Sequence, residues 1–197
     1  MSSLMDLLQS TIKDTSIGEL SEQLGQDEQT TSNAIDSALP MLIGALKRSS
    51  ALDGGAGLSK ALEKKHDGSI LDDVAGFVRK NDQSDGRGIL GHILGQNRDA
   101  AAMVLGAKSG IGESKAASLM ATLAPVVLGA LGKAKSQKKL GGGDLARLLD
   151  DESASLQQRS PAVMGALSGL LDADGDGDTD LADLLKHGKK GLSSFLR

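Results

Sequence analysis

The chain of 197 residues contains no cysteine, tryptophan or tyrosine and only two phenylalanines. The absence of cysteine excludes disulfide bridges, thiolate metal ligands and cysteine nucleophiles. The scarcity of aromatic side chains leaves no stacking platform for single-stranded nucleic acid, and a net charge of -4 argues against a general nucleic-acid binder. We therefore expect no nucleic-acid partner.

The N-terminus lacks the features of a secretory signal. Residues 1–10 have neither a basic start nor a long apolar stretch. By inspection of the sequence, no apolar run is long enough to span a bilayer. We therefore expect a cytoplasmic protein without a transmembrane segment.

The core must be built almost entirely from aliphatic side chains. Leucine and alanine favour helices, whereas runs of β-branched and aromatic residues typical of strands are hard to find. The 26 glycines, about twice the average usage, fit short helices with glycine caps and close helix contacts. The composition predicts an all-α fold.

An internal repeat organises the chain. Residues 25–50 align without a gap on residues 110–135, as expected of duplicated supersecondary units packed on each other. The matching pairs are Gly25 and Gly110, Glu28 and Glu113, Pro40 and Pro125, Gly44 and Gly129, Ala45 and Ala130, and Leu46 and Leu131. We predict a multi-helix bundle of two related helical units, residues 1–86 and 87–160, followed by a helix-loop-helix in residues 161–197.

Within each repeat the apolar residues recur at steps of three and four, which predicts a helix that buries one face. Pro40 and Pro125 lie inside these patterns, so we expect each helix to kink or to restart there. Residues 88–97 form a short amphipathic segment whose three glycines could admit a close helix contact. Residues 136–144 are typical of a flexible basic connection, with Asp144 as the N-cap of the next helix.

The most specific chemical pattern is an acidic loop in residues 172–183. Its spacing is that of an EF-hand calcium loop, with aspartates at positions 1, 3 and 5 and Gly177 at position 6, where the chain must turn. The predicted metal ligands are Asp172, Asp174, Asp176, Asp178, Asp180 and Asp183. Aspartate replaces the usual glutamate at position 12, which leaves selectivity for Ca²⁺ over Mg²⁺ open.

A solvated acidic turn without an ion is the alternative to a metal site. In such a turn the six negative charges would repel one another without a cation to neutralise them. A turn without an ion also does not explain why position 6 is a glycine, Gly177. Two weaker copies of the spacing begin at Glu63 and Asn81, but both lack enough oxygen ligands. We predict that these two are glycine-containing turns between helices.

Four segments together resemble the bacterial family called domain of unknown function 937, which includes YidB-like proteins. They are residues 88–95, 105–111, 123–133 and 171–178, which combine glycine-punctuated helices with the acidic loop. The aspartate at position 12 also resembles the loops of dockerin modules. The family resemblance implies a bacterial, helical, non-secreted protein. It carries no established activity and supplies no catalytic residues.

The candidates for catalysis are few. His66, His92 and His187 each lie beside glycine, aspartate or lysine, where a solvated or helix-capping histidine is the ordinary explanation. We therefore predict that the protein is not an enzyme. The sequence favours a calcium-binding helical protein that acts as a structural or scaffolding module, with a protein partner or a second copy of itself as its partner.

Other functions stay open at this point. Thr179 at loop position 8 is only a partial substitute for the aliphatic residue that pairs two EF-hand loops. The C-terminal segment mixes Lys186, Lys189 and Lys190 with apolar residues, a pattern suggestive of an interfacial helix on a membrane surface. Dockerin-like docking to an extracellular partner is disfavoured by the missing signal and the single loop, and an enzyme is the least favoured function.

Overall fold

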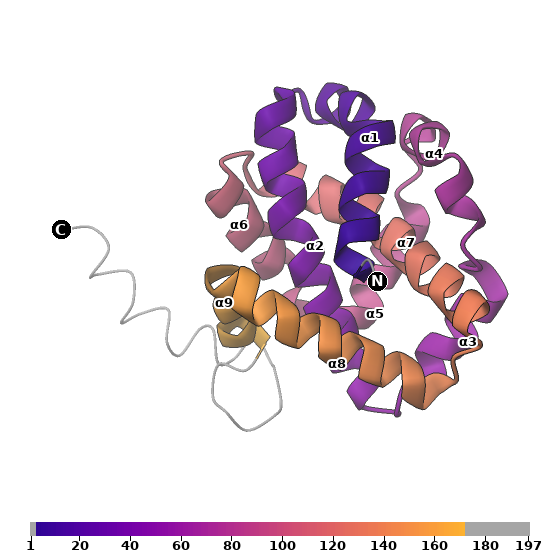
Figure 1. Cartoon of the computed structure of the whole chain (residues 1–197). Coiled ribbons are helices and arrows are strands. Elements are labelled where there is room, and N and C mark those ends of the chain that lie inside the picture. Colours follow the sequence, from indigo (N-terminus) through magenta and orange to yellow (C-terminus); the bar gives the residue numbers. More distant parts are fainter. Residues whose placement is uncertain (1–2, 172–197) are drawn as a thin grey trace.

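The structure is a computed structural model that describes residues 3–171. This part of the chain folds into helices without any β-strand, which confirms the all-α prediction (Figure 1). The α-helices are α1 (Leu4–Leu24), α2 (Glu28–Ala51), α3 (Ala56–Lys65), α4 (Val74–Lys80), α5 (Ser84–Ile93), α6 (Arg98–Ser109), α7 (Glu113–Lys138), α8 (Gly142–Arg159) and α9 (Pro161–Leu171). Two short 3-10 helices, η1 (Ser69–Asp72) and η2 (Gly95–Asn97), lie between them.

The first two helices form an antiparallel pair in Figure 1. Helix α1 ends because Gly25 takes up the left-handed conformation (φ 54°), which glycine adopts without steric cost. Two residues later the side chain of Asp27 accepts a hydrogen bond of 2.8 Å from the backbone N–H of Thr30 and caps α2. Local sequence signals thus set this tight connection.

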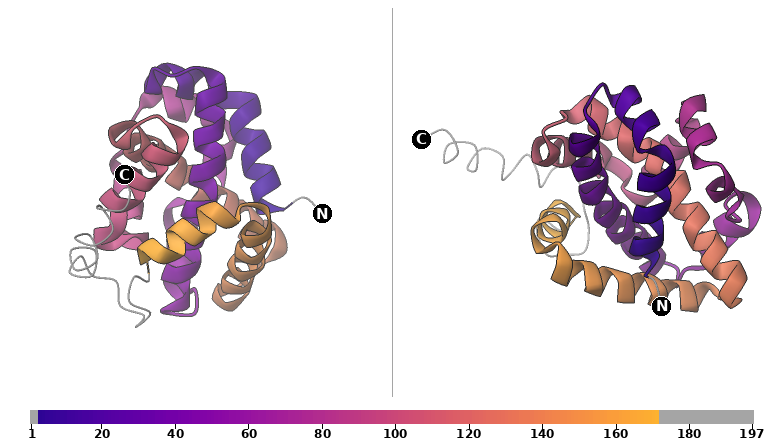
Figure 2. Two further views of the ribbon diagram at one scale, coloured as in Figure 1. Left: turned by 90° about the vertical axis from the view of Figure 1, so that its left-hand side faces the viewer. Right: turned by 45° about the horizontal axis from the view of Figure 1, so that its top comes forward.

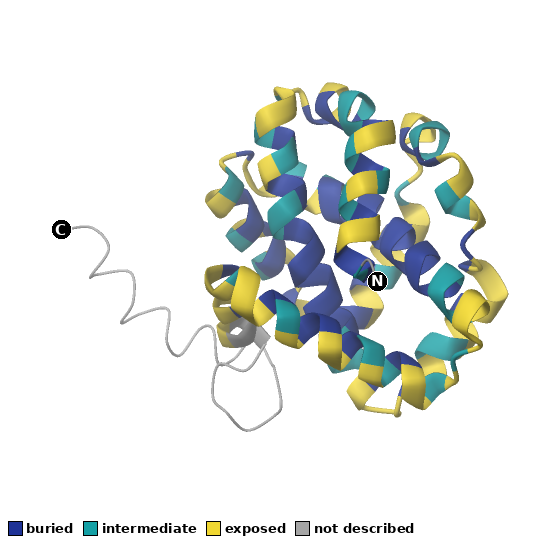
Figure 3. Ribbon diagram, in the orientation of Figure 1, coloured by how far each residue is buried: buried dark blue, intermediate teal, exposed yellow. Residues whose placement is uncertain are grey.

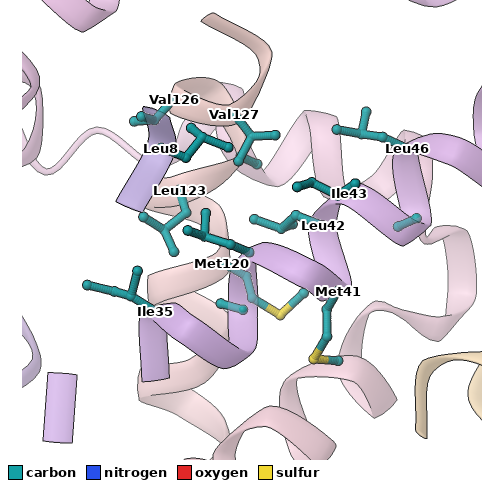
Figure 4. Packing of buried hydrophobic residues seen from close by; sticks show 14 of the residues in the cluster. Leu8, Ile35, Met41, Leu42, Ile43, Leu46, Met120, Leu123, Val126 and Val127 are labelled. Carbon is teal, nitrogen blue, oxygen red and sulfur yellow. The ribbon is translucent and has the colours of Figure 1, made fainter. Parts of the chain in front are cut away.

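Helix α7 is the centre of the molecule and contacts α1, α2, α3, α5 and α6. Every residue from 119 to 132 is buried, so the middle of this helix has no solvent-facing side (Figure 3). The same is true of residues 38–46 in α2, whose side chains pack against those of α7 (Figure 4). The prediction that each helix buries a single face is therefore wrong for both middle segments, because neighbours surround them.

The two prolines do not interrupt their helices. Helix α2 continues through Pro40 and α7 through Pro125, so the helices do not restart there. Both helices begin at the aligned glutamates, Glu28 and Glu113, three residues after a left-handed glycine. These features agree with the repeat. The duplication itself and the boundaries at residues 86 and 160 stay predictions.

By length and composition, α7 could cross a membrane, whereas the sequence analysis predicted no apolar run of sufficient length. However, 83% of its most apolar stretch is buried inside the protein. A core helix that is surrounded by other helices is equally hydrophobic, because none of its sides faces water. Burial by the surrounding helices accounts for the apolar composition of α7 without a membrane.

Helix α8 crosses the lower ends of α1 and α2 in Figure 1. It begins at Gly142, and the backbone N–H of Gly141 donates to the Asp144 carboxylate at 3.0 Å, so Asp144 lies in the first turn and not at the N-cap. Residues 136–138 belong to the end of α7. The predicted flexible connection is therefore only a short turn through residues 139–141.

Candidate functional site

The predicted calcium ligands, Asp172 to Asp183, lie outside the described residues, as does His187. In sequence, loop position 1 follows directly on Leu171, the last residue of α9. Among residues 3–171, no group of three or more histidine, aspartate or glutamate side chains could hold a metal ion. The weaker copy that begins at Glu63 runs from the end of α3 through a turn at Gly68, as predicted. The copy that begins at Asn81 lies mostly within α5, with Gly86 inside the helix, so the prediction of a turn is wrong for that copy.

A pocket of about 530 Å³ opens between the C-terminal end of α2, α3 and α5; we call it the α2–α3–α5 pocket. Its wall combines apolar side chains with three serines and with charged and imidazole side chains. The apolar residues are Leu46, Leu58, Ala61, Ile89, Ile93 and Leu128. The charged and imidazole residues are Asp53, Lys65, His66, Asp85 and His92.

Glycines on two helices fix the position of the polar wall. A side chain at Gly132 of α7 would overlap the carbonyl oxygen of His66, so the backbone at His66 lies directly on the helix. A side chain at Gly86 of α5 would overlap the carbonyl oxygen of Ala121, which brings α5 equally close to α7. Because both contacts are between backbones, they leave little freedom for the wall to move.

His66 is the C-cap residue of α3, as a helix-end position predicts, but only 8% of it is exposed. Of the two expected roles, solvated or helix-capping, His66 takes the second by its position, and its side chain is buried. Its Nε2 atom lies 3.6 Å from Oδ2 of Asp85, the nearest opposite charge. Burial lowers the pKa of His66 below its usual 6.5, while the negative charge of Asp85 opposes this in part. Burial therefore favours the neutral form of the imidazole.

Asp53, by contrast, has a structural role. Its two carboxylate oxygens accept hydrogen bonds from the backbone N–H groups of Gly55 (3.0 Å) and Gly57 (2.6 Å) at the start of α3. His92 is exposed on α5. The three serines that also line the pocket are Ser49, Ser50 and Ser84.

Sequence reasoning did not find this pocket. Its wall combines residues from 46 to 128, which no local spacing connects. One usable signal was present: Gly129 and Gly132 lie three residues apart in the apolar middle of α7, and both face the segment from His66 to Ile70. A glycine pair at this spacing marks one side of a helix that another backbone approaches closely.

Residues 6–134 match the family described as bacterial protein of unknown function (DUF937). This segment is more than half of the chain. The chain belongs to the DUF937 family. The DUF937 segment includes every residue that lines the α2–α3–α5 pocket, and it ends before α8, α9 and the acidic loop. No match is found among curated proteins or among solved structures.

Proposed function

We propose that this DUF937 protein is a non-enzymatic calcium-binding module that acts in scaffolding or in contacts with other proteins. The observation that supports the proposal most is the position of α9. This helix ends at Leu171, so the first predicted ligand, Asp172, follows directly on a helix. An EF-hand-type loop requires an entering helix at that point.

Helix α9 is held against the helical body. It contacts α2, α6 and α8, and in the left view of Figure 2 it crosses α2. Its anchoring side chains are Val163 (6% exposed) and Met164 (4% exposed). An ion bound at the end of α9 would neutralise the aspartates that follow it and stabilise the last turn of the helix. Through these contacts, calcium binding would also stabilise the body.

Thermal unfolding with and without calcium tests the proposal. A ligand that binds only the folded state at about 100 times its Kd stabilises it by about 2.7 kcal/mol. For a chain of this size, that corresponds to a rise in Tm of about 5–10 °C. Magnesium in place of calcium measures selectivity, and calorimetric titration gives the stoichiometry. We expect one ion per chain.

Variants locate the site. The double variant Asp172→Ala with Asp176→Ala should lose the calcium-dependent rise in Tm. Asp14→Ala with Asp99→Ala is the matched control, since it removes the same charge from two exposed positions of α1 and α6. If the loop variant responds to calcium like the wild type, the proposed site is wrong.

The interaction part of the proposal has its own test. Sedimentation with and without calcium should reveal calcium-dependent self-association, and an unchanged monomer in both conditions contradicts calcium-driven assembly. Liposome flotation distinguishes the membrane-surface alternative, in which the basic residues Lys186, Lys189 and Lys190 contact anionic lipid. Within DUF937 we further propose that the chain is YidB-like and cytoplasmic, on the sequence features given above.

A further inference from the structure

We propose that the α2–α3–α5 pocket binds a small organic cation, namely a protonated amine carried on an apolar chain or ring. The site is independent of the calcium loop, because all its residues lie between Leu46 and Leu128. The volume of about 530 Å³ is within the range of small-molecule sites, which runs from roughly 300 to 1,000 Å³. The ligand class follows from the wall and from its charges.

The apolar part of the wall fits the apolar part of such a ligand. Leu46 and Leu128, which line the pocket, are buried core residues of α2 and α7. Leu58 of α3 and Ile89 of α5 are partly buried and pack against the same core. A hydrocarbon chain bound there would be removed from water and would contact side chains of several helices. The burial of apolar surface is the main source of affinity in pockets of this kind.

The charges in the wall favour a cation. Two carboxylates, Asp53 and Asp85, and one ammonium, Lys65, line the pocket, and burial lowers the pKa of His66, which favours its uncharged form. Asp53 is occupied by two backbone N–H groups. Asp85 makes no hydrogen bond to another described residue, and its one close partner is the imidazole 3.6 Å away. The Asp85 carboxylate is therefore the group that can accept hydrogen bonds from a ligand ammonium.

The pocket is formed before any ligand binds. The backbone contacts of Gly86 and Gly132 with α7 and with His66 hold both polar walls in place. A ligand would therefore not need to order this part of the chain, and less of its binding free energy would be lost to ordering. This favours measurable affinity for a ligand of only a few carbon atoms.

Titration with three six-carbon probes tests the ligand class. Hexylamine, hexanol and hexanoate share an apolar chain and differ in charge. In methyl NMR spectra of the full chain in EDTA, hexylamine should shift the signals of Leu58 and Ile89 saturably. Hexanoate should bind at least about tenfold more weakly, because a carboxylate would meet Asp85. Hexanoate binding as tightly as hexylamine, or no saturable shift with hexylamine at millimolar concentration, overturns the proposal.

Two variants test the location. Asp85→Asn removes the charge at an exposed position and should weaken hexylamine about tenfold while leaving hexanol unchanged. Gly88 lines the pocket, and a Cβ there meets no atom within 4 Å, so Gly88→Leu should fill the space and abolish binding.

The matched control is Gly91→Leu. Gly91 lies on the same helix with equally open surroundings but does not line the pocket. It should bind hexylamine like the wild type. Equal binding by the Gly88 and Gly91 variants, or an unchanged affinity in Asp85→Asn, contradicts the assignment. The calcium response is read separately, so the two proposals fail independently.

Discussion

Replacement of one glycine should test how His66 is held. Gly132 is buried in α7, and a Cβ at this position would lie 2.8 Å from the carbonyl carbon of His66 and closer still to its oxygen. Real Cβ atoms essentially never approach within 3.0 Å of another heavy atom. The atoms in the way belong to the backbone, so no side-chain rotation can relieve the overlap, and in Gly132→Ala the two segments must move apart.

The magnitude follows from two opposing effects. Alanine in place of glycine inside a helix is favourable by about 1 kcal/mol, because the unfolded chain loses freedom. Overpacking a buried site costs about 1–3 kcal/mol, and a clash between backbones belongs at the upper end. We expect Gly132→Ala to lower the free energy of unfolding by about 1–2 kcal/mol. Gly91→Ala, whose Cβ meets nothing within 4 Å, should raise it by about 0.5–1 kcal/mol.

Urea unfolding followed by circular dichroism measures this difference, since the chain has no tryptophan for fluorescence. The two variants should differ by about 1.5–3 kcal/mol with similar m-values. The His66 ring signals should shift in Gly132→Ala and stay in place in Gly91→Ala. If Gly132→Ala is as stable as Gly91→Ala, the close contact between α7 and the His66 backbone is wrong.

Two further substitutions give expected outcomes. Because the folded pKa of His66 lies below the unfolded value of about 6.5, the unfolded state binds more protons, so the free energy of unfolding should fall as pH drops below that value. His66→Gln should reduce this slope between about pH 5 and 7 in urea titrations, and an unchanged slope would assign the pH dependence to other groups. The buried carboxylate of Glu152 accepts a 2.7 Å hydrogen bond from the backbone N–H of Leu4 at the start of α1. Glu152→Ala should therefore cost about 1–2 kcal/mol in urea unfolding, whereas the exposed neighbour Asp151, changed to alanine, should cost little; equal losses in both would contradict the capping role.

The fold class was accessible from the sequence because it depends on local preferences. A core without aromatic or β-branched runs can be built only from helices, and helix ends at Gly25 and Gly110 follow from glycine's access to positive φ. Which faces are buried was not accessible. The periodic pattern in α2 and α7 indicates one apolar face, yet small residues such as Gly129 let further segments cover the other side.

The glycines show the same limit. The three glycines of residues 88–97 were predicted to admit a close helix contact. However, a Cβ at Gly88, Gly91 or Gly95 would meet no atom within 4 Å. The glycine that brings α5 onto α7 is Gly86, just outside that segment. The spacing of glycines shows only that another segment can approach a helix closely on one of its sides. Only the tertiary arrangement decides which side faces a neighbour.

The two candidate sites differ in the same way. The proposed calcium loop can be read from the sequence because all its predicted ligands come from twelve consecutive residues with a fixed spacing. In the α2–α3–α5 pocket, His66 and Asp85 come together from positions that are separated in the sequence by η1 and α4. Their 3.6 Å contact corresponds to no recognisable sequence motif. From the sequence alone, His66 cannot be distinguished from an exposed histidine at a helix end, because its burial depends on the tertiary structure.

The lack of aromatic residues connects the core to the pocket. Without large rings to fill space, the helices approach until backbone meets backbone, as at Gly86 and Gly132. Such contacts cannot adjust by changing a rotamer, so they fix the two walls that carry Asp85 and His66. A single methyl group at Gly132 should therefore do more than lower stability. It should displace the His66 wall and weaken hexylamine binding, while a methyl group at Gly91 should leave both the wall and the binding unchanged.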